Sequence, residues 1–259
     1  MNSEELKDFL EHKYRLYNQT SFIETDPIQI PHRFSKKADI EIAAFLASTI
    51  AWGQRKSIIA NASKLLNLMD NDPYHFVTGF DKPNEKHLKQ FVHRTFNGDD
   101  LIIFLHALKR VYLEYGSLEM AFLKGFNAGG IKQAIIGFRE GFFIENPTVH
   151  ALKHISNPVK GAAAKRLNMF IRWMVRKDEF GVDFGLWKSI PPSELMCPLD
   201  VHSGRVARAL GILGRKQDDW LAVEQLTGSL RQLDASDPVK YDFALFGLGV
   251  FEKFPLSDD

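Results

Sequence analysis

The chain has 259 residues, of which 45% are hydrophobic, so it can bury a substantial core as one large domain or as two packed lobes. Its net charge is +1, so charge alone does not indicate a nucleic-acid partner. The single cysteine, Cys197, excludes an internal disulfide and any zinc or iron–sulfur site built from several cysteines. The absence of a long apolar run and the charged amino-terminal stretch lead us to expect a cytoplasmic protein.

Apolar residues recur at helical spacing along most of the chain, which predicts an all-α protein. Asp39 is suited to cap a helix over 40–52, and a second helix is expected to follow Gly53 and Gln54, over 55–69. Prolines and glycines predict irregular connectors at 20–37 and 178–199. Further helices are predicted over 84–94, 99–115, 117–125, 129–143, 147–154, 162–177, 203–211, 218–232 and 238–248.

The order of these elements predicts a two-lobed helical fold. Residues 40–155 are expected to form a central helical lobe. The amino-terminal helix is too short to form a domain of its own, so we expect it to pack with the carboxy-terminal helices. Residues 1–39 and 156–259 would then form the second lobe, and the chain would cross between the lobes twice.

The segment HALKHISNPVKGAAAKRLNMFIRWMVR (150–176) is the first of two that combine turns with basic residues. A helix is expected to end near His154, a tight turn to follow over 157–161, and small residues to open the next helix. Such a turn aims backbone N–H groups and the positive end of a helix at one point, which suits a nucleic-acid phosphate. Lys165 lies in the first turn of that helix, where the dipole disfavours an ammonium and favours the neutral amine that a nucleophile needs.

The segment MCPLDVHSGRVARALGIL (196–213) supplies a carboxylate. Asp200 directly precedes the helix expected near Ser203, a position that is typical of a helix cap. Arg205 and Arg208 follow on the same helix, and a basic face beside an acid suits a phosphate backbone lying across a catalytic carboxylate. Asp200 is suited to stabilise positive charge on a sugar ring or to assist deprotonation of an attacking amine.

Together these segments resemble the helix-hairpin-helix DNA glycosylase superfamily, which includes endonuclease III and 8-oxoguanine glycosylase. CPLDVHSGRVARALGIL (197–213) is similar to the family segment with the catalytic aspartate, and KRLNMF (165–170) resembles the start of the second hairpin helix, with its Schiff-base lysine. AFLASTIAWGQRKSIIANASKLL (44–66) is similar to the family's early helix pair, whose loop carries a glutamine that fills the gap left by a flipped base. The long stretch between Lys165 and Asp200 and the lack of cluster cysteines are most similar to the archaeal 8-oxoguanine glycosylases. The chain also resembles an uncharacterised bacterial family of conserved hypothetical proteins.

The resemblance implies a two-lobed DNA glycosylase with AP-lyase activity, which removes a damaged base, such as an oxidised purine, from double-stranded DNA through a Schiff base on Lys165, with Asp200 as its catalytic partner. It implies no cofactor and no metal, and we expect a monomer that does not bind membranes. In the closing segment DPVKYDFALFGLGVFEKF (237–254), Asp237, Lys240 and Asp242 are alternative contacts to the base. The residues implied to contact DNA are Gln54, Arg55, Lys56, Lys160, Gly161, Arg166, His202 and Arg205, and the candidates for the base pocket are Trp52, Trp173 and Phe246.

Two other functions remain open from the residues. The first is a helix-hairpin-helix module that binds DNA without catalysis. The second is a metal-dependent hydrolase, because His150 and His154 have the i, i+4 spacing of metal ligands on a helix and could act with Asp200 and His202. The glycosylase interpretation requires the Lys165 amine and the Asp200 carboxylate to face each other in one cleft.

Overall fold

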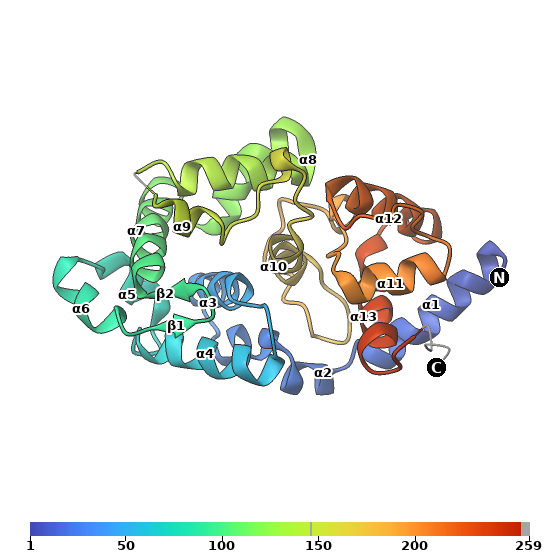
Figure 1. The fold of residues 1–259 in the computed structure, drawn as a ribbon, viewed down its shortest axis with the longest axis horizontal. Coiled ribbons are helices and arrows are strands. Elements are labelled where there is room, and N and C mark those ends of the chain that lie inside the picture. Colours follow the sequence, from blue (N-terminus) through green and yellow to red (C-terminus); the bar gives the residue numbers. More distant parts are fainter. Residues whose placement is uncertain (146, 255–259) are drawn as a thin grey trace. The chain divides into compact units, whose positions relative to one another are not determined.

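The computed structural model describes residues 1–145 and 147–254. Of these described residues, 66% lie in helices and 2% in strands, which confirms the predicted all-α class (Figure 1). Within the described ranges, no helix is both long enough and apolar enough to cross a lipid bilayer. The internal contacts divide the chain into two compact units: unit 1 comprises Met1–Phe22 and the chain from Asn157 onward, and unit 2 comprises Ile23–Ser156.

The boundary after Phe22 differs from the one that the sequence predicted after residue 39. It falls within α2 (Thr20–Thr25), in the segment expected to be irregular. Two short 3-10 helices follow, η1 (Pro27–Gln29) and η2 (Pro31–Arg33). They pack on the first long helices of unit 2 and bury Ile28 and Ile30 completely, so this segment belongs with unit 2.

Unit 1 is organised around α13 (Asp242–Val250), an apolar helix on which α1 (Ser3–Tyr17) and α11 (Val201–Ala209) both pack. Two glycines permit this close approach. A Cβ on Gly247 would lie 2.0 Å from the ring of Tyr17 on α1, and one on Gly249 would lie 3.2 Å from His202 on α11. The other elements of unit 1 are η4 (Pro158–Lys160), α10 (Lys165–Val175), η5 (Pro192–Glu194), α12 (Trp220–Leu233) and η6 (Pro238–Tyr241).

Unit 2 has α3 (Lys37–Thr49) at its centre, and every residue of this helix from Asp39 to its end is buried. The buried Glu41 accepts hydrogen bonds from the Tyr112 hydroxyl (2.9 Å) and the Leu118 N–H (3.1 Å), which joins α3 to α7 (Gly98–Tyr115) and α8 (Leu118–Phe142). The other elements are α4 (Arg55–Asn67), α5 (Pro73–Gly79), η3 (Lys82–Asn84), α6 (Glu85–Leu88), β1 (Val92–His93), β2 (Phe96–Asn97) and α9 (Val149–Leu152).

The predicted helix over 84–94 is wrong. The helical part ends at Leu88, and β1 pairs antiparallel with β2 through Val92 opposite Asn97 and His93 opposite Phe96. Arg94 makes the turn with a left-handed backbone (φ 54°). Phe91 and Phe96, both completely buried, pack their rings against each other at 6.1 Å, so tertiary packing overrides the local helical pattern.

Candidate active site

The turn over 157–161 and the start of α10 position Lys165. Pro158–Lys160 form η4, and Gly161 ends the turn with a left-handed backbone (φ 81°) that favours glycine. Ala162 then pairs with Asp219 in an isolated β-bridge, and the Trp220 N–H donates to the Gly161 carbonyl at 2.9 Å. The chain is therefore not helical over 162–164, where Ala164 has a left-handed backbone (φ 50°), and α10 begins at Lys165 rather than at residue 162. The preceding α9 is a single turn, shorter than the predicted helix over 147–154.

The backbone N–H groups of the turn are used within the turn. Those of Lys160 and Ala162 donate to the Asn157 carbonyl, that of Val159 donates to the Asn157 side chain, and that of Gly161 donates to the Pro158 carbonyl. The predicted cradle of N–H groups aimed at a phosphate is therefore not formed by these residues. In the described part of the chain no side chain makes a capping hydrogen bond at the start of α10.

The structure brings Lys165 and Asp200 together. The Lys165 Nζ lies 3.6 Å from Asp200 Oδ2, and the two side chains are 29% and 28% exposed. Lys165 is the first residue of α10, and Asp200 is the residue before α11. An ion pair at this depth is partly desolvated yet still open to solvent, which suits a group that has to meet a ligand.

The Asp200 carboxylate is fixed by the helix that it caps. Its Oδ1 accepts the N–H groups of His202 (2.9 Å) and Ser203 (3.0 Å), while the Ser203 hydroxyl accepts the Asp200 N–H (2.9 Å), completing a capping box. Burial raises the pKa of Asp200, but the Lys165 ammonium and the Ser203 and His202 N–H groups outweigh it and hold the pKa below its usual range. The carboxylate is therefore ionised at neutral pH, with Oδ2 turned to the amine.

A second carboxylate, Asp242, lies in the same electrostatic environment. It is the first residue of α13, it is buried, and it accepts a short hydrogen bond from the Arg172 guanidinium. Burial raises its pKa to about 6; the charges of Arg172 and Lys165 lower this pKa and that of Asp200 raises it. Asp242 thus titrates close to neutral pH, whereas Asp200 does not. Among Asp237, Lys240 and Asp242, the charge of Lys165 acts on the pKa of Asp242.

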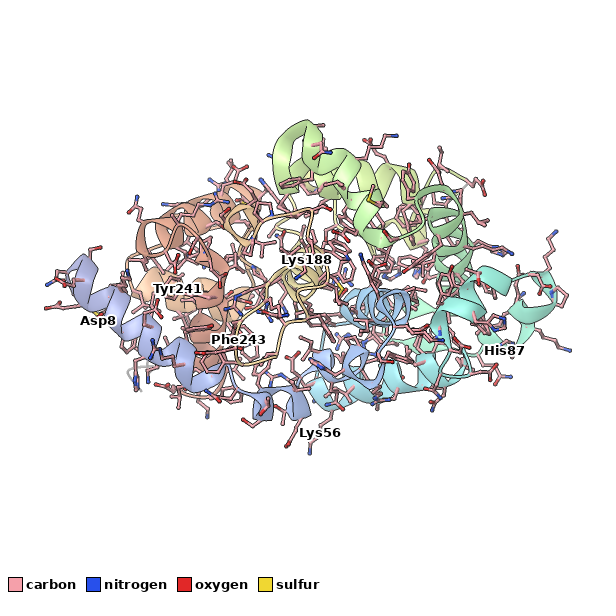
Figure 2. The ribbon with its side chains drawn as sticks, turned by 180° about the vertical axis from the view of Figure 1, so that it is seen from behind. Asp8, Lys56, His87, Lys188, Tyr241 and Phe243 are labelled. Carbon is pink, nitrogen blue, oxygen red and sulfur yellow. The ribbon has the colours of Figure 1, made fainter. Side chains whose placement is uncertain are left out.

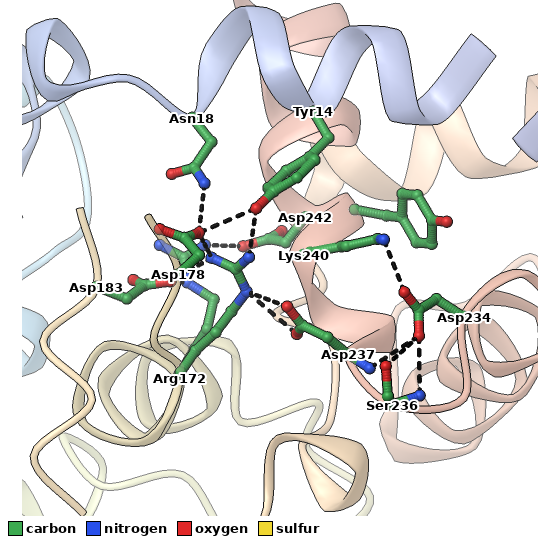
Figure 3. A network of polar contacts seen from close by, with 12 residues as sticks. Tyr14, Asn18, Arg172, Asp178, Asp183, Asp234, Ser236, Asp237, Lys240 and Asp242 are labelled. Atoms are coloured by element: carbon green, nitrogen blue, oxygen red, sulfur yellow. Dashed lines mark hydrogen bonds and ion pairs between the residues drawn. The ribbon is translucent and has the colours of Figure 1, made fainter. Parts of the chain in front are cut away.

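The end of α10 carries a saturated ionic network instead (Figure 3). The buried Arg176 donates from Nε to Asp237 (2.8 Å) and from Nη1 to Asp183 (3.1 Å), and it also contacts Asp178 (2.6 Å) and the Tyr14 hydroxyl (2.8 Å). A cavity of about 360 Å³ opens beside this network, and its lining includes neither Lys165 nor Asp200. The two arginines near the end of the basic segment 150–176 are thus interior, because Arg172 and Arg176 are 4% and 0% exposed.

The residues expected to contact DNA differ in exposure. Lys160, Gly161, His202 and Arg205 are exposed in unit 1, whereas Arg166 is half-buried, and burial lowers its pKa to about 10. In unit 2 Gln54 and Lys56 are exposed and Arg55 is half-buried, and Figure 2 shows Lys56 pointing away from α4. The second arginine of the basic helix face, Arg208, pairs with Asp218 at 2.6 Å.

The candidates for the base pocket lie in different surroundings. Trp173 is completely buried on α10 and offers no surface to a base, so it belongs to the core of unit 1. Phe246 is half-buried and packs edge-on against Phe22 at 5.8 Å. Trp52 is half-buried in unit 2, where it stacks on the ring of His154 at 5.9 Å.

The metal-hydrolase alternative combined residues that the structure assigns to different units. His150 and His154 belong to unit 2, whereas Asp200 and His202 belong to unit 1. Both histidines instead contact Asp100, which the sequence did not single out for this role.

The sequence also missed Asp183 and the structural role of Arg172. Arg172 bridges Asp183 (3.3 Å) and Asp242, and its guanidinium lies 4.3 Å from the ring centre of Phe243. The sequence signal for this role was the apolar composition of the helix around Arg172. In the structure every residue from Leu167 to Val175 is buried, and an arginine in such a helix has to be paired.

No curated protein and no solved structure matches the chain. A family model, described as "Protein of unknown function (DUF2400)", matches residues 26–251. The matched range contains Lys165, Asp200 and Asp242, so the candidate site lies within the shared part of the sequence. The chain belongs to this family.

Proposed function

We propose that the chain is a DNA glycosylase with AP-lyase activity, in which Lys165 is the nucleophile and Asp200 is its electrostatic partner. The observation that carries the proposal is the 3.6 Å separation of the Lys165 amine and the Asp200 carboxylate, two residues far apart in sequence and both at helix starts. The sequence motifs that surround both residues add to it, through their resemblance to the helix-hairpin-helix glycosylases.

The proposed reaction begins when a damaged nucleotide turns out of the duplex. The Lys165 ammonium first gives its proton to solvent. The amine then attacks C1′ of the sugar, the glycosidic bond breaks, and the base leaves with the bonding electron pair and takes up the proton that the attacking amine releases. Asp200, ionised because of its lowered pKa, stabilises the positive charge that develops on the sugar. Ring opening gives the Schiff base, and loss of a proton from C2′ then expels the 3′ phosphate, which cleaves the strand.

The exposed basic groups of unit 1 are suited to hold the phosphate backbone. Lys160 is exposed in the turn, Arg205 is exposed on α11, and the uncapped N–H groups at the start of α10 lie next to Lys165. In unit 2, Gln54 is exposed next to the start of α4, as a contact to DNA requires.

Borohydride trapping tests this proposal. The purified chain is incubated with duplex DNA that contains an abasic site or 8-oxoguanine, and sodium borohydride reduces any Schiff base to a stable covalent complex. We expect the wild type to be trapped and Lys165→Ala to give no complex. Lys216→Ala is the matched control, because Lys216 is an exposed lysine of the same unit outside the site, and it should be trapped as the wild type is.

The possible outcomes separate the alternatives. Equal trapping of Lys165→Ala and the wild type would show that another amine reacts. DNA binding without a complex on any lesion of a panel would favour the non-catalytic module. A loss of strand cleavage on addition of a chelator, with trapping absent, would favour a metal-dependent hydrolase.

A further inference from the structure

Unit 2 holds a compact cluster of one carboxylate and two imidazoles, which we call the Asp100 cluster (Asp100, His150 and His154). The His150 Nδ1 lies 2.8 Å from Asp100 Oδ1, and the His154 Nε2 lies 3.1 Å from Asp100 Oδ2. One ligand atom from each of the three residues lies within 4.8 Å of the other two. Asp100 comes from the start of α7, and the histidines come from α9 and the residues that follow it.

The geometry of the cluster fits one metal ion. Zinc binds imidazole nitrogen and carboxylate oxygen at about 2.0–2.2 Å, so two ligands on one tetrahedral ion are about 3.4 Å apart. One carboxylate oxygen, Asp100 Oδ2, lies 2.9 Å from the His150 Nδ1 and 3.1 Å from the His154 Nε2, and both separations are close to that value. Two histidines and one carboxylate also form a donor set that divalent transition metals use when they keep solvent positions open.

The surroundings hold the ligands in place. The Asp100 carboxylate accepts the Asn97 N–H at 3.0 Å, as part of the capping box of α7. The His154 ring is buried between Trp52, stacked at 5.9 Å, and Phe96, edge-on at 4.9 Å. Partners that orient the ligands in this way are typical of metal sites and restrict the rotation of the imidazole.

The cluster is also accessible from one side. The side chains of Asp100 and His154 are 2% and 3% exposed, whereas that of His150 is 41% exposed. An ion can therefore enter beside His150 and keep water on that side. Its positive charge would compensate a carboxylate that is removed from solvent.

We propose that Asp100, His150 and His154 bind a divalent transition-metal ion of the zinc type, with solvent completing its coordination. The ion joins the start of α7 to α9, the last helix of unit 2, and thereby also holds Trp52 through its contact with His154. The site lies wholly within unit 2 and is independent of the function proposed for Lys165 and Asp200.

Metal titration of the full chain tests the site. The protein is stripped with a chelator and titrated with Zn²⁺ by calorimetry and with Co²⁺ by visible absorption, which reports coordination geometry. We expect one ion per chain, a rise in the unfolding temperature on binding, and an affinity that His150→Ala lowers by about tenfold or more. His150 is the ligand to change first, because its exposed side chain makes a folding defect small.

Two matched controls and a second variant complete the experiment. His75→Ala removes an exposed histidine of unit 2 and Asp99→Asn changes the exposed neighbour of Asp100, and both should bind metal as the wild type does. Asp100→Asn keeps the shape of the side chain and should also lose the high-affinity site. Absence of stoichiometric binding, or equal binding by the wild type and His150→Ala, would overturn the proposal and leave histidine–carboxylate hydrogen bonds only.

Discussion

The two ends of α10 hold cations in opposite ways. At its start, the Lys165 amine meets the Asp200 carboxylate at 3.6 Å, with both side chains partly exposed. At its end, the guanidinium of Arg176 is completely buried and is surrounded by Asp178, Asp183 and Asp237. A buried cation with carboxylates on several sides is committed to the fold, whereas a loosely paired amine can exchange its partner for a ligand.

The largest effect is expected from Arg176→Met. Removing the guanidinium leaves Asp183 and Asp237 without their shared cation, and breaking a buried pair in this way costs about 3–5 kcal/mol of unfolding free energy. Urea denaturation measures the change. The exposed neighbour provides the control, since Lys177→Met should shift the free energy by less than about 0.5 kcal/mol. A loss below about 1 kcal/mol for Arg176→Met would remove the distinction between the two ends of α10.

The ionisation of Asp242 should make the unfolding free energy depend on pH. Its pKa is about 6 in the folded protein, against an ordinary value of 3.8, so the folded state holds the proton to higher pH. Stability is therefore lost as the pH rises from about 4 to about 6, by about 3 kcal/mol. Compared with the wild type, Asp242→Asn should gain stability across this window when both are unfolded in urea at successive pH values. If the unfolding free energies of the two proteins changed with pH in the same way, the pKa of Asp242 would not be raised.

Asp200 allows its role in folding to be separated from its role in the site. Asp200→Ala removes the cap of α11 and should lower the unfolding free energy by about 1 kcal/mol. Asp200→Asn keeps an oxygen for the His202 and Ser203 N–H groups and should cost less. Both variants remove the negative charge beside Lys165, so both should slow borohydride trapping. Trapping at the wild-type rate by Asp200→Asn would show that the carboxylate serves only as a cap.

The smallest stability effect is expected at Lys165 itself. A partly exposed ion pair contributes about 1 kcal/mol or less, so Lys165→Met should unfold at nearly the wild-type urea concentration. The same variant should form no covalent complex with DNA. If Lys165→Met destabilised the protein as much as Arg176→Met, Lys165 would belong with the structural cations.

The helical class and the positions of Lys165 and Asp200 next to helix starts were predictable from local pattern. Period and cap residues are properties of short segments, and Asp200 forms the capping box that its place before a helix indicated. The turn over 157–161 was also recognisable from Asn157, Pro158 and Gly161. The internal use of its N–H groups was not, because that depends on the conformation of the turn.

The partners of Arg172 and Arg176 were beyond local pattern. Asp183 lies in an irregular connector and Asp242 on the last helix, and only the packing of unit 1 brings them to α10. In unit 2 the same limit applies to Asp100, whose contact with His150 and His154 depends on how α7 and α9 meet. The charge of an arginine alone therefore does not indicate whether it lies on the surface, as Arg172 and Arg176, 4% and 0% exposed, show.

The two oxygens of the Asp200 carboxylate have different partners, and this difference affects any reaction at Lys165. Oδ1 is engaged by the His202 and Ser203 N–H groups, while Oδ2 faces the amine. The rotational freedom of this carboxylate is thus lost once, when α11 forms, and not at each encounter with a substrate. A ligand that enters beside Lys165 meets a preorganised charge, and none of its binding energy has to be spent on orienting it.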